Sequence, residues 1–271
     1  MKIIIPMAGL GTRFAKNSDK NPEYKKPKPF IEVRGIPMIR WATGSLPFIE
    51  HKEKYGEVKP EDLTFIILKD HNDEYHLADG LKEIYSPKIN IVILDTPTRG
   101  AGETVYMARN YIDLEDDLLI TDSDHFFNGK YLYDAIKNKH QNTAGIIPVF
   151  MARNEGIPKW SYSLVGDDNI ISKVAEKDRN LMELGAHANI GAYYFSKGNI
   201  FIDQIEENLK NNEMYGDEGK KEFYIAPLYQ KLIEKGMKIQ AAIVPEVWGL
   251  GTPSDLEYFI DNADIQNPWY E

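Results

Sequence analysis

Apolar runs and amphipathic stretches alternate along the first 150 residues of the chain. Continuous apolar runs ended by turn residues predict buried strands, and longer stretches with apolar residues at helical spacing predict helices. The expected strands are residues 2–6, 63–69, 89–95, 117–122 and 144–150, and the expected helices are residues 37–48, 73–85, 102–112 and 129–140. Strands that alternate with helices are typical of βαβ units. We therefore predict an α/β fold with three α/β/α layers and a mostly parallel central sheet.

The pattern changes after residue 150. The expected elements there are two strands within 161–177 around a turn at 166–169, a strand at 189–195, a helix at 222–236, a strand at 237–245 and a helix at 252–263. No internal repeat and no low-complexity linker divides the chain. We expect one domain over residues 1–271, in which the half 151–271 adds a small antiparallel lobe to the half 1–150.

Composition excludes several classes of protein. The chain has no cysteine, which excludes disulfides, thiolate catalysis and cysteine-type zinc sites. No apolar run reaches the roughly 18 residues of a membrane helix, and the apolar start is too short for a signal peptide. We expect a cytoplasmic protein without membrane insertion. The net charge of −10 argues against nucleic acid as a partner, and the sequence leaves open whether the chain forms a homo-oligomer.

Positive charge gathers at the N-terminus of this acidic chain. Residues 1–40 contain nine Lys or Arg and three Asp or Glu, so their balance is +6 and the remainder carries −16. Such a basic segment can concentrate a small polyanion in one cleft. A lysine-rich surface loop would give the same charge pattern. The charge alone therefore does not distinguish an anion-binding segment from a solvated loop, and the motif within the segment has to be considered.

The motif is a strand that runs into Met-Ala-Gly-Leu-Gly-Thr-Arg-Phe at 7–14. Strands followed by Gly-x-Gly bring backbone N–H groups close to phosphates. No P-loop string occurs, and Phe14 stands where the dinucleotide fingerprint needs its third glycine. Arg13 offers a planar fork suited to phosphate, and Thr12 offers a hydroxyl. Lys28 stands between Pro27 and Pro29, which restrict the chain around it.

These strings resemble the nucleotidyltransferase family of sugar-1-phosphate pyrophosphorylases and small cytidylyltransferases. The family signature is a strand, G-x-G-T/S-R, and then P-K-P before an apolar strand and helix, as in residues 30–42 here. The resemblance implies a Rossmann-like fold of the nucleotide-diphospho-sugar transferase type, with the nucleotide on the half 1–150 and the second substrate on the half 151–271. It assigns the phosphates and catalysis to Arg13 and Lys28. It assigns nucleotide binding to Ala8, Gly9, Gly11, Thr12, Gly100, Ala101 and Thr104, the last three by a partial match to the G-T-A-x-A segment.

An acidic motif follows the strand expected at 117–122. Asp122 and Asp124 are spaced i, i+2 at the carboxyl end of that strand, where open α/β sheets bind ligands. Carboxylates in such a pair are hard oxygen ligands suited to Mg²⁺. The resemblance places the metal on Asp124, with Asp122 as a secondary ligand and His125 as a weaker candidate. Capping of a turn is the structural alternative.

Two further strings resemble the family in the second half. Val174-Ala175-Glu176-Lys177 is similar to V-x-E-K-P, whose glutamate and lysine contact the second substrate, but Asp178 replaces the proline. Asn189 and Gly191 match the N-x-G-x-Y strand that lines the same pocket. By resemblance, Glu176, Lys177, Asn189 and Gly191 bind the second substrate.

The C-terminal string Trp248-Gly-Leu-Gly-Thr-Pro-Ser-Asp255 resembles the family's W-x-D-x-G-T-P-x-D ending. Thr252, Pro253 and Asp255 have the spacing of a helix capping box, with the proline at the first helical position. The aspartate that often completes the family's metal site is missing, since Gly249 and Leu250 stand there. This departure leaves open whether one or two metal ions are used.

The resemblance implies an enzyme that transfers a nucleoside monophosphate from a triphosphate to a small phosphomonoester and releases pyrophosphate. The expected cofactor is Mg²⁺. CTP is favoured slightly over UTP and dTTP, and surface polysaccharide biosynthesis is the expected context, with a sugar 1-phosphate or another small phosphorylated compound as second substrate. Two alternatives remain: a metal-dependent glycosyltransferase of GT-A type and a nucleotide-binding regulator without catalysis.

Overall fold

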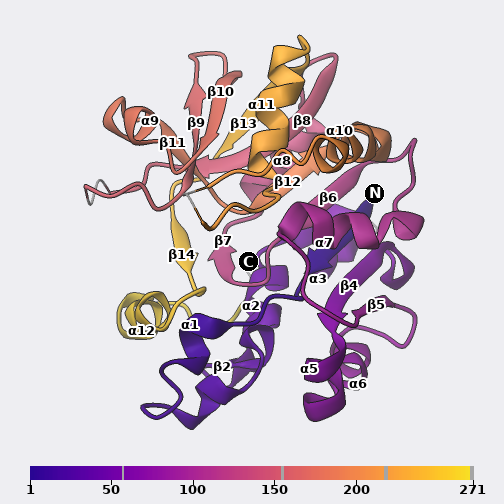
Figure 1. The fold of residues 1–271 in the computed structure, drawn as a ribbon, viewed down its shortest axis with the longest axis vertical. Helices are drawn as coiled ribbons and strands as arrows, with labels where there is room; N and C mark the ends of the chain where they lie inside the picture. Colours follow the sequence, from indigo (N-terminus) through magenta and orange to yellow (C-terminus); the bar gives the residue numbers. More distant parts are fainter. Residues whose placement is uncertain (57, 154–155, 217–218, 269–271) are drawn as a thin grey trace. The chain divides into compact units, whose positions relative to one another are not determined.

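The structure is a computed structural model that describes residues 1–56, 58–153, 156–216 and 219–268 (Figure 1). The chain forms two compact units, each built from separate segments. Unit 1 comprises residues 1–4, 98–121 and 131–245, and unit 2 comprises residues 5–97, 122–130 and 246–271. Each unit therefore draws on both predicted halves of the chain, and the assignment of substrates to those halves stays a prediction.

Unit 2 contains the parallel pair β4 (Leu63–Leu68) and β5 (Asn90–Leu94), in register from Thr64 opposite Asn90. Every residue of β4 is buried. A continuous apolar run of this kind is typical of a parallel strand covered on both faces. Its other sheet pairs are antiparallel and short: β2 (Glu32–Val33) with β3 (Ile36–Pro37), and β7 (His125–Phe127) with β14 (Val247–Gly249).

The helices of unit 2 pack partly around aromatic side chains. They are α1 (Thr12–Ala15), α2 (Met38–Gly44), α3 (Pro47–Glu50), α4 (Lys52–Tyr55), α5 (Lys69–Tyr75), α6 (Leu77–Ile84) and α12 (Pro253–Asn262), with 3₁₀ turns at Pro22–Lys25, Lys28–Phe30 and Pro60–Asp62. The buried Trp41 meets Phe126 and Phe259 edge to face, at centroid distances of 5.3 and 5.0 Å. Phe14 belongs to the same core cluster, so the turn after β1 is fixed against residues far along the chain.

Two helices predicted as continuous are broken. Residues 37–48 form α2 and α3 with a break before Pro47, whose ring cannot continue a helix from the preceding turn. Residues 69–84 form α5 and α6, separated by His76 in the left-handed conformation at φ 51°. The Asn72 side chain accepts a hydrogen bond from the Ala78 N–H and so satisfies a backbone donor at the break.

Unit 1 contains a mixed sheet with the strand order β10-β9-β11-β8-β12-β6-β1, and β13 pairs with β8. Its strands are β1 (Lys2–Pro6), β6 (Leu118–Thr121), β8 (Thr143–Phe150), β9 (Ser161–Val165), β10 (Ile171–Glu176), β11 (His187–Asn189), β12 (Ala192–Phe195) and β13 (Lys238–Ile243). β1 pairs with β6 in parallel, as β13 does with β8, whereas the pairs from β6 through β12, β8, β11 and β9 to β10 are antiparallel. The strand predicted at 189–195 is two strands, because the chain turns at Gly191 with φ 66°.

The helices of unit 1 are α7 (Ala101–Met107), α8 (Lys130–Lys137), α9 (Arg179–Glu183), α10 (Gly198–Lys210) and α11 (Ala226–Glu234), with a 3₁₀ turn at Arg109–Tyr111. The sequence did not predict α10. It starts at a glycine without a side-chain cap, and its buried face includes the polar residues Gln204 and Asn208. The amide of Gln204 donates to the side-chain oxygen of Asn208 over 2.8 Å. Because these polar residues stand on the buried face, they interrupt the apolar periodicity that would reveal the helix.

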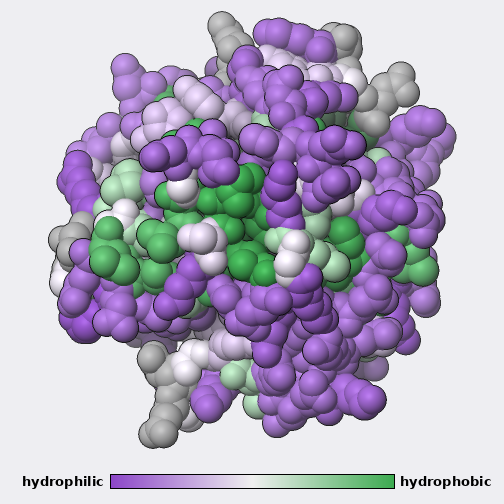
Figure 2. All heavy atoms as spheres, turned by 90° about the horizontal axis from the view of Figure 1, so that it is seen from above, coloured by the Kyte–Doolittle hydropathy of each residue, from purple (hydrophilic) through white to green (hydrophobic). Residues whose placement is uncertain are grey.

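Both units combine strands and helices as expected, so the predicted α/β class is confirmed, with a mixed sheet and an antiparallel region within residues 161–195. Among the described residues, none of the helices combines the length and the apolar character needed to cross a bilayer. Figure 2 shows hydrophilic residues over much of the face that it draws, with hydrophobic residues gathered toward its middle.

Candidate functional site

The glycine turn follows β1 directly and lies in unit 2. The Met7 N–H donates to the Ile66 carbonyl over 2.8 Å, which ties the turn to β4. Ala8 is buried, whereas Gly9 and Leu10 are exposed. Gly11 has φ +61°, a left-handed conformation that favours glycine, and it starts α1. Thr12 and Arg13 are exposed on α1, so both side chains predicted to bind the triphosphate are accessible to a ligand.

Lys28 reaches the acidic motif from the proline-flanked segment. Its Nζ lies 2.6 Å from Oδ2 of Asp124, and the two side chains are 28% and 22% exposed. A Cβ added to Gly11 would lie 3.8 Å from the Cβ of Lys28, so the glycine turn and the lysine are neighbours. The predicted glycine, lysine and metal-binding acid therefore meet in one place, although residues 28 and 124 are far apart in the sequence.

Three potential metal ligands cluster at this place. One carboxylate oxygen each of Asp122 and Asp124 and one imidazole nitrogen of His125 all lie within 4.8 Å of one another. The backbone of Asp124 is held by its carbonyl, which accepts from the Leu250 N–H over 2.8 Å. A Cβ on Gly251 would lie only 2.4 Å from Oδ2 of Asp124, so only a glycine leaves room for that carboxylate.

Burial and neighbouring cations set the charges of the cluster. Burial alone would raise the pKa of Asp124, but Lys28, His125 and Arg13 together hold the pKa of its carboxyl below the usual range. Burial lowers the pKa of His125 to about 4, a shift that Lys28 reinforces and Asp124 opposes. At neutral pH the cluster therefore holds an ionised Asp124 beside a neutral imidazole.

These residues fit a divalent cation. Nε2 of His125 is buried and has no hydrogen-bond partner among the described residues, and such an orphaned nitrogen is unusual in a folded protein. Carboxylates suit Mg²⁺, and an imidazole adds a donor favoured by first-row transition metals. The chemistry of the donor set and the cradle at Gly251 together support a metal site here.

The partial match at residues 98–104 lies in unit 1 and is tightly packed. The Phe223 N–H donates to the Arg99 carbonyl over 2.9 Å, and the Gly102 N–H donates to the Phe223 carbonyl over 2.7 Å. Gly100 has φ +144°, and a Cβ there would lie 2.6 Å from the Phe223 nitrogen. Ala101 begins α7, and the buried Thr104 hydroxyl lies 2.6 Å from the hydroxyl of Thr98. Glycine is thus required by the backbone itself, and base binding by these residues stays a prediction.

The predicted second-substrate residues also lie in unit 1. Glu176 ends β10, and Lys177 follows it with φ 50°, which is uncommon for a side-chain-bearing residue. Asp178 replaces the family's proline and caps α9, since its carboxylate accepts from the Leu181 N–H over 2.8 Å. The ammonium of Lys177 lies 5.6 Å from the centroid of the Tyr224 ring. This cation–π contact orients Lys177, which, unlike Glu176, has the positive charge needed to bind a phosphate.

Asn189 and Gly191 have structural contacts of their own. Asn189 is buried, accepts from the Ser163 hydroxyl over 2.7 Å and donates to the Ser161 hydroxyl over 3.2 Å. Gly191 provides the left-handed turn between β11 and β12. A substrate contact by either residue stays a prediction.

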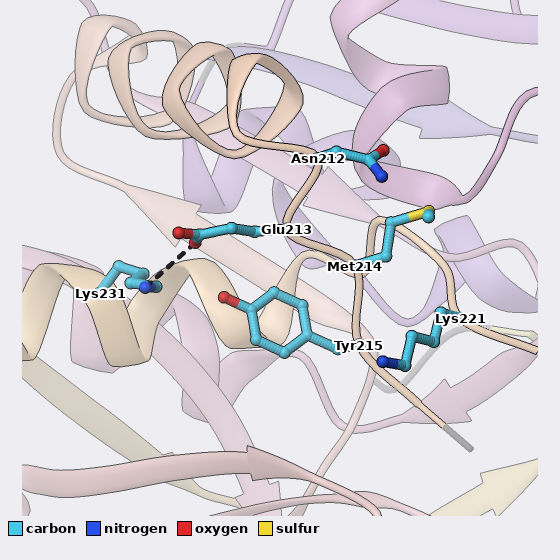
Figure 3. A pocket seen from close by; sticks show the side chains of 6 residues that line it. All are labelled: Asn212, Glu213, Met214, Tyr215, Lys221 and Lys231. Atoms are coloured by element: carbon cyan, nitrogen blue, oxygen red, sulfur yellow. Dashed lines mark ion pairs between the residues drawn. The ribbon is translucent and has the colours of Figure 1, made fainter. Parts of the chain in front are cut away.

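Unit 1 also has an open pocket of about 380 Å³ beyond the C-terminal end of α10. Figure 3 shows the ion pair between Lys231 and Glu213 at its rim, with an N–O distance of 3.0 Å. The lining residues are Asn212, Glu213, Met214, Tyr215, Lys221 and Lys231. None of the predicted site residues is among them.

Comparison with known proteins tests the resemblance that the sequence motifs indicate. No family model matches the chain. The chain is 26% identical over 229 residues to the bifunctional protein GlmU of Fervidobacterium nodosum. The matched residues make up 84% of this chain and 43% of that protein. The chain spans about half the length of the curated relatives that it matches. The predicted resemblance to the nucleotidyltransferase family is confirmed.

Solved structures confirm the fold. A nucleoside-diphosphate-sugar pyrophosphorylase from Vibrio cholerae matches with a TM-score of 0.73 and 23% identity, over 96% of this chain and all of that one. An inositol-1-phosphate CTP transferase from T. maritima matches with a TM-score of 0.66 and 15% identity, over 97% of this chain and 96% of that one. The predicted Rossmann-like, nucleotidyltransferase-type fold is therefore confirmed.

Gly251 is a functional residue that the sequence does not reveal. It lies in the string G-T-P, and nothing in that string indicates that the glycine abuts Asp124. The Thr252 side chain caps α12 as predicted, accepting from the Asp255 N–H over 3.2 Å. The reciprocal half of the capping box differs, since the Asp255 carboxylate accepts from the Thr252 hydroxyl over 2.6 Å instead. The G-T-P segment thus both starts a helix and shapes the wall beside Asp124.

Proposed function

We propose that this chain transfers a nucleoside monophosphate from a nucleoside triphosphate to a small phosphomonoester and releases pyrophosphate. The observation that supports this most directly is the pairing of Lys28 with Asp124 next to Gly11. An ammonium and a carboxylate that neutralise each other beside a glycine turn can exchange partners for a triphosphate and a divalent cation. The relatives act on the same classes of compound according to their names, which agrees with the proposal.

In the proposed reaction an oxygen of the acceptor phosphate attacks the α-phosphorus of the triphosphate. The bond from that phosphorus to the bridging oxygen breaks, and pyrophosphate leaves with the electron pair. The acceptor is already an anion at neutral pH, so no general base and no covalent nucleophile are needed. Catalysis then comes from positioning and from neutralising charge.

Several of the predicted residues have a part in this scheme. Ala8, Gly9, Gly11 and Thr12 let the backbone approach the triphosphate, while Arg13 and Lys28 bind its phosphates. Asp124, with Asp122, would hold the divalent cation, for which Mg²⁺ is the expected ion. When bound, that ion supplies charge neutralisation on the phosphates. Lys177, steadied by Tyr224, and Glu176 are proposed to contact the acceptor.

The finer assignments follow the sequence. We propose CTP as the favoured donor, with UTP and dTTP as alternatives, and a sugar 1-phosphate or a related phosphorylated compound as the acceptor. We place the reaction in the cytoplasm and in surface polysaccharide biosynthesis. The experiment is pyrophosphate release with ATP, CTP, GTP, UTP and dTTP in turn, against phosphorylated sugars, amines and amino-acid derivatives. Cleavage of a nucleotide-sugar without a triphosphate would instead support a glycosyltransferase.

Two variants test the residue roles. We expect Lys28→Ala and Asp124→Ala each to lower kcat/KM by at least about 100-fold, because each removes charge compensation from the reacting phosphates. The exposed Lys16 and Asp19 provide matched controls, and Lys16→Ala and Asp19→Ala should retain near-normal turnover. Near-normal turnover in purified, folded Lys28→Ala or Asp124→Ala would refute the role of that residue.

A further inference from the structure

His125 lies beside the two carboxylates without a task in the proposed reaction. Its residue is 7% exposed, and its buried Nε2 has no hydrogen-bond partner among the residues that the structure describes. One of its ring nitrogens lies within 4.8 Å of the ligand oxygens of Asp122 and Asp124. Buried polar atoms are normally satisfied, so this imidazole needs an explanation that the protein atoms alone do not provide.

The backbone and the neighbours hold the imidazole in place. His125 begins β7 and pairs with Gly249 of β14. Its ring lies 5.5 Å from the ring of Phe127, centroid to centroid. Asp124 is fixed by the Leu250 N–H, and Gly251 leaves space at its Oδ2. A site whose donors are held in this way is prepared for a ligand rather than assembled by it.

We propose that His125 is a third protein ligand of the divalent cation at Asp122 and Asp124, and that its imidazole makes the site bind Mn²⁺ and Co²⁺ more tightly than Mg²⁺. The proposal deepens the proposed function, on which it rests for the identity of this site as a metal site. Mg²⁺ prefers an all-oxygen environment and keeps several waters, whereas imidazole is a good ligand for first-row transition metals. A metal bond through Nε2 would also satisfy a nitrogen that has no partner within the described part of the chain.

Lys28 modulates this site. Its ammonium lies 2.6 Å from Oδ2 of Asp124 and competes with a cation for that oxygen. Arg13 adds further positive charge to the surroundings of Asp124. We therefore expect metal binding to strengthen when a triphosphate draws these two side chains away, and the measurement is made with and without a non-hydrolysable triphosphate.

The direct test is pulsed EPR of the full chain loaded with Mn²⁺, with histidine labelled either with ¹⁴N or with ¹⁵N. We expect a directly bound nitrogen whose coupling changes with the isotope, and we expect His125→Gln to lose it. The exposed His140 supplies the control, since His140→Gln should keep the signal. In titrations, His125→Gln should lose at least about tenfold in Mn²⁺ affinity, with Mg²⁺ affinity changed much less.

The outcomes separate the two proposals. Absence of nitrogen coupling in the wild-type protein, or its persistence in folded His125→Gln, overturns the ligand role of His125. If His125→Gln does not fold, the isotope comparison in the wild-type chain decides the question without a variant. Nitrogen coupling without pyrophosphate release would support this inference and refute the proposed function. Pyrophosphate release without nitrogen coupling would support the proposed function and refute this inference.

Discussion

The candidate residues of unit 2 pair with one another, whereas several of those in unit 1 pair with the scaffold. In unit 2, Lys28 and Asp124 neutralise each other over 2.6 Å, and both side chains are partly exposed. In unit 1, Asn189 is buried between two serine hydroxyls, at 2.7 and 3.2 Å. Thr104 likewise shares its hydroxyl with Thr98 over 2.6 Å.

This difference separates groups that are free to change partners from groups that maintain the fold. A partly exposed ion pair contributes little to stability, so its members can be replaced with the fold intact. A buried amide that loses its partners leaves polar atoms unsatisfied, which costs stability directly. We therefore expect substitutions in the unit 2 cluster to act on turnover, and those at Asn189 to act first on folding.

Among substitutions outside the reacting side chains themselves, the largest effect is expected from Gly251→Ala. The added Cβ would lie 2.4 Å from Oδ2 of Asp124 and force that carboxylate to move. Because the obstructing atom is the end of a flexible side chain, the fold should survive. A displacement of about 1 Å at reacting groups can cost about 100-fold in rate, so we expect kcat/KM to fall by roughly that factor.

Gly249→Ala is the matched control for this prediction. A Cβ there would lie 3.6 Å from the nearest atoms of Asp255, which is an ordinary contact. Turnover of this variant should stay within about threefold of the wild type, since the added methyl group makes only ordinary van der Waals contacts. Equal losses in both glycine variants, measured by pyrophosphate release, would show that the effect does not pass through Asp124.

The same two regions show what the sequence could predict. The glycine turn, Lys28 and Asp124 follow from local strings, because a strand, a turn and flanking prolines are local features. The contact of Asp124 with Lys28 and the fit of Gly251 against it are long-range, and neither periodicity nor spacing encodes them. A resemblance to a family can suggest such a meeting, and only the folded chain gives its geometry.

The secondary-structure elements that the sequence did not predict also have specific physical causes. The helix α10 was not expected because the buried pair Gln204 and Asn208 interrupts its apolar face. The break at His76 was not expected because a left-handed histidine has no distinctive sequence signal. In both cases a polar residue stands where tertiary contacts, rather than local propensity, decide the conformation.

A smaller effect, on stability, is expected at Asn189. Replacing it with alanine leaves the hydroxyls of Ser163 and Ser161 without this partner, and we expect the free energy of unfolding to fall by about 2 kcal/mol. Urea unfolding of the variant measures this loss. The exposed Asn211 is the control, and Asn211→Ala should change stability by less than about 0.5 kcal/mol. Unchanged stability together with a raised KM for the acceptor would instead mean that Asn189 contacts substrate.

The smallest expected effect tests the contact of Lys177, a proposed acceptor-binding residue of unit 1, with the aromatic ring of Tyr224. The Lys177 ammonium lies 5.6 Å from the centroid of the Tyr224 ring, and such contacts contribute about 0.5–1 kcal/mol at exposed sites. Tyr224→Leu removes the ring. The loss of about 0.5–1 kcal/mol corresponds to a two- to fivefold rise in KM for the phosphorylated acceptor. The KM for the triphosphate should not change, and Tyr224→Phe, which keeps the ring, should behave as the wild type.

If the phenylalanine variant is as impaired as the leucine variant, the tyrosine hydroxyl is the important group. If neither variant changes the KM for the acceptor, Lys177 is positioned by its left-handed backbone alone.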